Sequence, residues 1–175
     1  MESKFTNEEL LEIEKQLSCP SGPNGIQVGH KMNLSNIEMT ENSIALLGLS
    51  DSNTVLEIGH GNCGHLDFLI NQAEKIKYSG LEVSETMWNE AKKLVKSDQT
   101  EFKLYDGATI PYPDNHFNKI LTVNTIYFWN DPKALLKEVE RVLKPKGTFV
   151  ITYADKEFMQ HLPFVRNKFN LFDTD

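Results

Sequence analysis

The sequence predicts an α/β protein in which a doubly wound parallel sheet of five core strands is flanked by helices. Three observations support this prediction. From residue 50 onward, short apolar segments alternate with amphipathic helical segments, an order typical of parallel strands joined by crossover helices. A glycine cluster directly follows the first of these apolar segments. The 175 residues, of which 39% are hydrophobic and 25% charged, are enough for one domain with its own core.

Two helices and a leader are expected before the first strand. Thr6 and Glu9 have the spacing of a capping box, and apolar residues follow at helical intervals, which predicts a helix over residues 7–17. The prolines and glycines of "SCPSGPNGIQVG" predict an irregular leader over residues 19–35. We expect this leader to act as a lid that becomes ordered over the site when a ligand binds. A second helix is expected over residues 36–47, with the next glycine as its stop.

The alternating part of the chain supplies the remaining elements. The strands are expected at residues 53–59, 76–83, 100–106, 117–124 and 147–154. The helices between them are expected at residues 64–75, 85–96 and 132–143. Ser84 and Asp131 are typical N-caps, and Pro132 suits the first position of a helix. The four residues "KPKG" predict a turn before the last strand.

The pattern weakens after residue 154. One short helix is expected there, interrupted at Pro163, and no antiparallel hairpin is predicted. The fifth strand should therefore expose an edge, or be covered by the tail or by a second copy of the chain, because open edges favour association. These expectations predict either a shortened form of a longer protein or a homodimer.

Charge and cysteine content exclude several classes of function. The net charge of -7 argues against binding to a nucleic-acid backbone, which needs clustered basic residues. The two cysteines form neither a disulfide framework nor a metal-ligand spacing, so we expect no metal and a cytoplasmic location. The N-terminal segment has no apolar stretch typical of a signal peptide, and no apolar run has the length of a membrane-spanning helix.

The glycine cluster predicts a site for a nucleoside-containing cofactor. Gly59, Gly61 and Gly64 follow the first strand with the spacing of a dinucleotide-binding loop, and Glu82 ends the second strand. Glu57, however, stands in the buried strand just before the loop, where it would repel a pyrophosphate and attract an ammonium or sulfonium group. This charge favours S-adenosylmethionine over a nicotinamide cofactor, although a nicotinamide-dependent oxidoreductase remains the alternative.

Four segments in order carry a resemblance to a known family. "VLEIGHGNCGHL", "GLEVSETM", "YDGATIPYPDNHFNKI" and "LLKEVERVLKPKGTFVIT" resemble the successive motifs of class I S-adenosylmethionine-dependent methyltransferases. The most similar group is the type 11 family, which includes the ubiquinone and menaquinone methyltransferases. The resemblance implies a Rossmann-like cofactor-binding core over residues 50–154, preceded by the helices and leader of residues 1–49 and followed by an incomplete segment over residues 155–175.

The resemblance implies a role for each position of the cofactor site. Glu57 organises the amino end of the methionine moiety, and Glu82 accepts hydrogen bonds from the ribose hydroxyls. The loop approaches the cofactor at Gly59, His60 and Gly61. The remaining implied contacts are Val83 and Met87 against the adenine, Asp106 and Gly107 beside its amino group, and Asn124 beside the methionine and the methyl group.

Plainer interpretations of some of these residues remain open. Glu57 could cap loop amides, Asp106 could be an ordinary turn residue, and Met87 could belong to the core. His30, Tyr127 and Trp129 are the substrate-binding hypotheses, although the two aromatic residues could equally pack beneath the next helix.

Three positions depart from the family pattern. Cys63 stands where these enzymes usually have their third glycine; if this position needs a positive φ, either Cys63 is strained or Gly64 provides the turn. Asn118 replaces an aspartate and Lys146 a glycine, and both should affect stability more than chemistry.

The sequence thus predicts methyl transfer from S-adenosylmethionine to a small-molecule acceptor. No residue stands out as the general base, and the catalytic residues stay unassigned. A protein that binds the cofactor without turnover is the second alternative.

Overall fold

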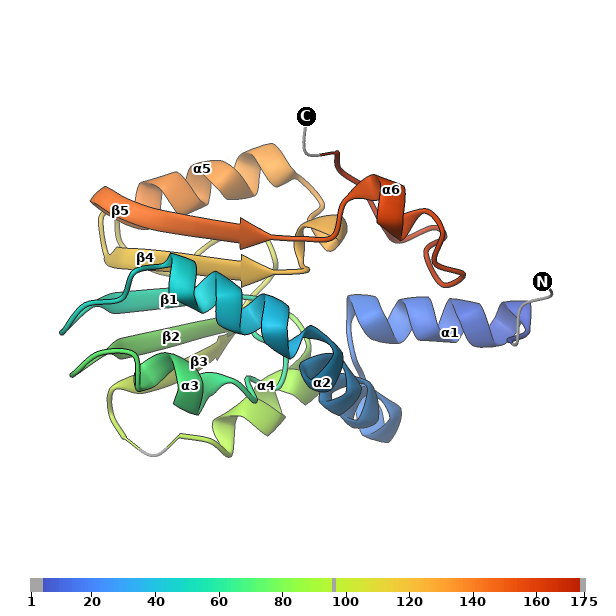
Figure 1. Cartoon of the computed structure of the whole chain (residues 1–175), viewed down its shortest axis with the longest axis horizontal. Helices are drawn as coiled ribbons and strands as arrows, with labels where there is room; N and C mark the ends of the chain where they lie inside the picture. Colours follow the sequence, from blue (N-terminus) through green and yellow to red (C-terminus); the bar gives the residue numbers. More distant parts are fainter. Residues whose placement is uncertain (1–4, 96, 174–175) are drawn as a thin grey trace.

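The computed structural model describes residues 5–95 and 97–173 and contains a five-stranded parallel sheet in the order β3-β2-β1-β4-β5 (Figure 1). The strands are β1 (Thr54–Ile58), β2 (Lys77–Glu82), β3 (Thr100–Leu104), β4 (Phe117–Val123) and β5 (Leu143–Thr152). The order places β1 in the middle, between β2 and β4, where the order of the strands reverses. This arrangement confirms the predicted doubly wound sheet and its five strands.

Helices cover both faces of the sheet. The helices of the described residues are α1 (Asn7–Ser18), α2 (Gly22–Leu46), α3 (Leu66–Ile70), α4 (Glu85–Lys92), the 3-10 turn η1 (Ile126–Phe128), α5 (Pro132–Val142) and α6 (Lys156–Met159), of which α1 and α6 lie beyond the carboxyl ends of the strands (Figure 1). Apolar residues of α2, α3 and α4 pack on one face around Val55, whereas those of α5 pack on the other face around Leu56 and Ile58. Neighbouring residues of β1 therefore alternate between two cores, as expected for a strand that is buried on both faces.

Three predicted helix starts, those capped by Thr6, Ser84 and Asp131, are confirmed. The Thr6 hydroxyl accepts a hydrogen bond from the Glu9 amide at 3.2 Å, and the Glu9 carboxylate accepts one from the Thr6 amide at 2.7 Å. Ser84 and Asp131 accept from the amides of the third residues of α4 and α5, at 3.1 and 3.0 Å. These bonds satisfy amides that have no partner inside a helix.

The irregular leader expected over residues 19–35 is wrong, because α2 begins at Gly22 and continues without a break to Leu46. The proline stands in the first turn, where a helix needs no amide donor. The two interior glycines allow close packing: a Cβ on Gly25 would lie 2.7 Å from the Pro20 carbonyl carbon, and one on Gly29 would lie 2.7 Å from the Met87 sulfur. The glycines therefore permit contacts and do not interrupt the helix.

Two other predicted helices are shorter, and the predicted turn lies within a strand. Helix α3 ends at Ile70, and the chain returns to β2 through turns with a left-handed Lys75. Helix α4 ends at Lys92, and the expected last residue, Lys96, lies outside the described residues. The residues "KPKG" belong to β5, near a register shift against β4. An edge strand tolerates a proline at such an irregularity, because the missing amide need not join the ladder.

The fifth strand lies at an open edge of the sheet. Within the described residues, no strand follows β5, and the chain continues into the short α6 beyond the carboxyl end of the sheet (Figure 1). The tail then reaches α1, where the buried carboxylate of Glu14 accepts hydrogen bonds from the amides of Arg166, Asn167 and Lys168 at 2.6–3.0 Å. The tail thus joins the N-terminal helix. None of the helices over the described ranges has both the length and the apolarity to cross a membrane.

Candidate functional site

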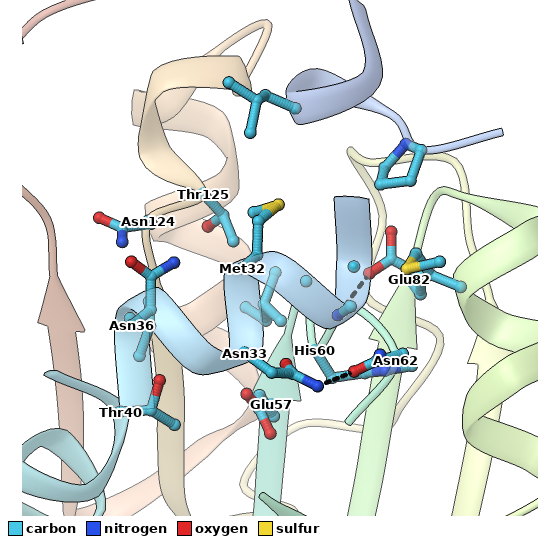
Figure 2. Close-up of a pocket in the computed structure, with 18 of the residues that line it drawn as sticks. Met32, Asn33, Asn36, Thr40, Glu57, His60, Asn62, Glu82, Asn124 and Thr125 are labelled. Atoms are coloured by element: carbon cyan, nitrogen blue, oxygen red, sulfur yellow. Dashed lines mark hydrogen bonds between the residues drawn. The ribbon is translucent and has the colours of Figure 1, made fainter. Parts of the chain in front are cut away.

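A cavity of about 370 Å³ lies at the carboxyl ends of β1, β2 and β4, with α2 along one side (Figure 2). This is the point where the strand order reverses, and open parallel sheets bind their ligands there. The cavity brings together most of the predicted positions: Glu57, Gly59, His60, Gly61, Glu82, Val83, Met87, Gly107, Asn124 and Trp129.

The glycine loop approaches the cavity with left-handed backbone at Gly59 and Gly61, whose φ angles are 73° and 58°. A Cβ on Gly59 would collide with the Thr125 methyl group, so the loop can pass this wall only as glycine. The third left-handed position is Cys63, at φ 55°, and Gly64 does not take over the turn. Cys63 therefore has the strained left-handed backbone itself. Its side chain is fully buried, and its sulfur lies 3.2 Å from the Tyr78 hydroxyl.

Glu82 organises the loop around the second strand. Its Oε2 accepts a hydrogen bond from the Gly61 amide at 2.8 Å, while Oε1 accepts from the amides of Val83 at 2.8 Å and Ser84 at 2.9 Å. Burial raises the pKa of this carboxyl, although the three amides act in the opposite direction. Because a carboxylate oxygen has two lone pairs, one acceptor position remains on Oε2.

Glu57 finds its partners in two side chains that the sequence did not indicate. Its Oε2 accepts a hydrogen bond from the Tyr78 hydroxyl at 2.6 Å and lies 2.8 Å from Nε2 of His65, and all three side chains are buried. Burial alone would raise the pKa of Glu57, but the charge and hydrogen bond of His65 lower it, and the same pairing raises the pKa of His65 well above its usual value. Glu57 is therefore ionised, and it does not cap loop amides.

This cluster also includes Cys63. Ligand-type atoms of Glu57, Cys63 and His65 lie within 4.8 Å of one another. The hydrogen bonds of Glu57 to His65 and Tyr78, together with the contact between Tyr78 and Cys63, account for this closeness without an ion.

His60 is buried on the floor of the cavity. Its ring packs 4.8 Å from that of Phe102 and lies against Gly80 of β2. Neither ring nitrogen has a hydrogen-bond partner within the part of the chain that the structure describes. Burial lowers the pKa of His60 to about 4, so the ring is neutral near pH 7.

Residues near the end of β4 form the opposite wall. Asn124 has a φ of 57°, and its side chain lies between the Met39 sulfur, at 3.3 Å, and the Tyr127 hydroxyl, at 3.2 Å. Trp129 lines the cavity and donates to the Thr125 hydroxyl at 3.1 Å.

Three predicted site residues do not line the cavity. Tyr127 braces the backbone, because its hydroxyl accepts from the Ala154 amide at 2.6 Å and donates to the Ala154 carbonyl at 3.0 Å. Asp106 is exposed and accepts from the amides of Ala108 and Thr109, as in an ordinary turn. His30 is exposed on α2.

Sequence reasoning missed the wall that α2 provides. Met32, Asn36 and Thr40 follow one another at a spacing of four and point toward the cavity in Figure 2. Asn33 belongs to the same wall and donates a hydrogen bond to Asn62 in the glycine loop. The spacing of four residues is typical of one face of a helix. It was not used because residues 19–35 were expected to be irregular.

The departures at Asn118 and Lys146 are structural. Asn118 joins β1 to β4 by accepting from the amide and hydroxyl of Thr54, at 3.0 and 2.8 Å, and from Lys144 at 3.1 Å. Lys146 has a left-handed backbone, with φ 65°, a conformation that suits the glycine usual at this position in the family. Both lie away from the cavity.

Comparison with known proteins identifies the family. The methyltransferase domain model matches residues 56–151. An uncharacterized methyltransferase of Bacillus subtilis, YdaC, is 28% identical over 129 residues, which cover 74% of this chain and 71% of that protein. The fatty-acid O-methyltransferase of Mycolicibacterium smegmatis is 31% identical over 100 residues, which cover 57% of this chain but only 36% of the enzyme. This chain thus spans about a third of that enzyme's length.

A solved structure has the same fold over almost the whole chain. A complex of the Haloferax volcanii Trm112 methyltransferase activator with a methyltransferase matches with a TM-score of 0.75 and 20% identity, covering 93% of this chain and 70% of that chain. These comparisons do not single out the ubiquinone and menaquinone methyltransferases within the family. The order of motifs, the sheet and the matching domain model agree: the chain belongs to the methyltransferase-domain family of class I enzymes, which use S-adenosylmethionine as methyl donor.

Proposed function

We propose that this methyltransferase transfers the methyl group to a small-molecule acceptor bound in the cavity beside α2. The observation that carries this proposal is a cavity of about 370 Å³ with two buried carboxylates, Glu57 and Glu82, on its wall. Its volume lies in the range of small-molecule sites. The similarity to a fatty-acid O-methyltransferase supports an acceptor of this size class.

The residues at the glycine loop fit the donor. Glu82 keeps one free lone pair on Oε2, enough for one ribose hydroxyl while its three amide bonds persist. Glu57 uses Oε2 for Tyr78 and His65, and over the described ranges its Oε1 makes no hydrogen bond. We assign Oε1 to the ammonium group of the methionine moiety, because the charges are opposite and the site is shielded from water.

The remaining assignments follow the cavity wall. Val83, Met87 and Gly107 flank the expected adenine position, and Asn124 lies at the methionine end. Asp106 reaches the adenine only if its exposed carboxylate contributes Oδ2, because Oδ1 already holds the turn.

The chemistry requires alignment more than acid–base catalysis. S-adenosylmethionine supplies an electrophilic methyl group on a sulfonium. The acceptor's lone pair forms the new bond to the methyl carbon, the carbon–sulfur bond breaks with its electron pair remaining on sulfur, and any proton on the acceptor passes to water. The cavity walls hold the acceptor in line with the methyl group, and such positioning can supply most of a rate enhancement. Such chemistry does not depend on a catalytic dyad, and we assign the Glu57 and His65 pair on the wall to donor binding.

The test combines binding and turnover. We expect S-adenosylhomocysteine to bind in a calorimetric titration, and protein incubated with methyl-labelled S-adenosylmethionine and a metabolite extract to label a small molecule that mass spectrometry identifies. Binding without any labelled product would favour the non-catalytic alternative. Protection from thermal unfolding by a nicotinamide cofactor, but not by S-adenosylhomocysteine, would contradict the proposal altogether.

A further inference from the structure

The cavity wall has an unusual charge balance. The chain has 18 lysines and arginines, yet none of them lines this cavity within the described residues. The acidic side chains on the wall are Glu57, which is paired with His65, and Glu82, which accepts three amide hydrogen bonds, while the His60 ring is neutral. Among the described residues, a ligand in this cavity therefore meets acidic side chains and no unpaired lysine or arginine.

The half of the cavity away from Glu82 is apolar with neutral polar groups. Figure 2 shows Asn36 of α2 and Asn124 on the same side, beside Met32 and Thr125. Ile37, Phe128 and Trp129 add apolar and aromatic surface. Because Glu57 and Glu82 are assigned to the donor, this half is left for the acceptor.

Asn36 is the available polar group in this half. The amide of Asn124 is held between Met39 and Tyr127. Asn36, by contrast, makes no side-chain hydrogen bond to any other described residue, although it lines the cavity. Its amide can both donate and accept, so it suits a hydroxyl, amine or amide on a bound molecule.

The movement of charge during the reaction also favours a neutral or cationic acceptor over an anionic one. Transfer from a sulfonium to a neutral acceptor moves the positive charge onto the acceptor, whereas transfer to an anion removes both charges. Carboxylates in the same cavity favour a positive charge that persists through the transition state over an approaching anion.

We propose that the acceptor carries no carboxylate or phosphate: it is an uncharged or cationic small molecule with an apolar body, whose polar group is held by Asn36. In this it differs from the fatty acid for which the Mycolicibacterium smegmatis relative is named, which supports only the size class of the acceptor. This inference rests on the proposed function, because it assumes that the two carboxylates serve the donor and that the other half of the cavity holds the acceptor.

The acceptor class is tested on fractionated metabolites. A metabolite extract is separated on a strong anion exchanger at pH 8, where carboxylates and phosphates are retained and neutral and cationic compounds flow through. Each fraction is incubated with the protein and methyl-labelled S-adenosylmethionine. We expect labelled product only in the flow-through reaction. Label mainly in the retained fraction would overturn the acceptor class while leaving methyl transfer intact. Bound S-adenosylhomocysteine with no label in either fraction would instead overturn the proposed function.

The role of Asn36 is tested by substitution. Asn36→Leu removes the amide but keeps a side chain of similar size, and Ser35→Ala changes an exposed neighbour on the same helix as a control. Loss of one hydrogen bond should lower transfer at saturating cofactor about 3- to 10-fold in Asn36→Leu. Its affinity for S-adenosylhomocysteine should stay within about twofold of that of Ser35→Ala, since the amide does not serve the donor. Equal transfer by the two variants, or an equal loss of cofactor affinity and transfer in Asn36→Leu, would contradict the assignment.

Discussion

At the scale of single residues, Glu57 and Glu82 are both buried at the carboxyl edge of the sheet, but they have different partners. Glu82 holds backbone amides of the loop, whereas Glu57 is held by side chains of His65 and Tyr78. The assignments to ribose and ammonium predict that substitutions of the two residues differ in kind.

Binding of three ligands separates the two roles. Glu82→Ala should reduce the binding free energy of S-adenosylmethionine, S-adenosylhomocysteine and adenosine alike by about 1.5–3 kcal/mol, because all three ligands carry the ribose. Glu57→Gln should weaken the binding of S-adenosylmethionine and S-adenosylhomocysteine, because it loses the attraction to their shared ammonium group. The binding of adenosine, which lacks this group, should stay nearly unchanged. Calorimetric titration measures both, with the exposed Glu85→Gln as control. If Glu57→Gln weakens the binding of adenosine as strongly as that of S-adenosylmethionine, Glu57 only stabilises the conformation of the loop.

The pairing of His65 with Glu57 predicts a dependence of stability on pH. The pKa of His65 is raised in the folded state, so the folded protein holds this proton more tightly than the unfolded chain does. The resulting stabilisation is complete below the unfolded-state pKa of about 6.5 and is lost as the pH rises through the folded value. The lowered pKa of Glu57 has the opposite sense, and its stabilisation is lost in acid.

Unfolding by urea between pH 5 and 9 measures this linkage. The free energy of unfolding of the protein should fall relative to that of His65→Gln as the pH rises above about 6.5, because the variant lacks the titrating group. His30→Gln changes an exposed histidine and should follow the unsubstituted protein. A constant difference between the protein and His65→Gln across this range would show that the pair is not charged.

At the scale of elements, α2 covers the cavity as a continuous helix and not as an irregular leader. Its first half reaches the glycine loop through Asn33 and packs against Met87 through Gly29. Cofactor bound between these partners should tie the helix to the loop.

Hydrogen exchange tests this coupling. We expect amides of residues 22–36 to exchange more slowly with S-adenosylhomocysteine than without it, because opening of the helix would then have to break ligand contacts. Amides of α5, on the far face of the sheet, serve as an internal control. Identical exchange of residues 22–36 in both states would show that α2 does not act as a lid.

Elements of this fold differ in how far neighbouring residues determine them, and hence in how well the sequence predicts them. Strands such as β1 and caps such as Ser84 are determined by neighbouring residues, and their pattern predicted them correctly. Gly25 and Gly29 were misjudged because local rules treat glycine as a helix breaker, whereas their role depends on contacts with Pro20 and Met87. The partner of Glu57 on β2, Tyr78, is 21 residues away and becomes visible only when the strands pair.

At the scale of the whole molecule, the described sheet ends in an open β5 edge. Unpaired edges favour pairing with another chain. We expect a homodimer through β5 at high protein concentration. Each copy carries a net charge of -7, so salt should strengthen the association by screening repulsion.

Light scattering after size exclusion measures this association over a range of protein and salt concentrations. A mass of one chain of 20.0 kDa at every concentration would contradict the dimer.

The three hydrogen bonds between Glu14 and the amides of residues 166–168 have a consequence for the order in which the protein folds. The three amides lie 152 to 154 residues after Glu14 in the chain, and Glu14 belongs to α1, the helix that supplies Leu17 and Ser18 to the cavity wall. Contacts between such distant residues form late, because the loop between them must first be closed. During synthesis we expect this part of the wall to be fixed only after residues 166–168 have left the ribosome. We therefore expect the parallel sheet to form before the cavity is complete, because contact between α1 and residues 166–168 closes the last part of its wall.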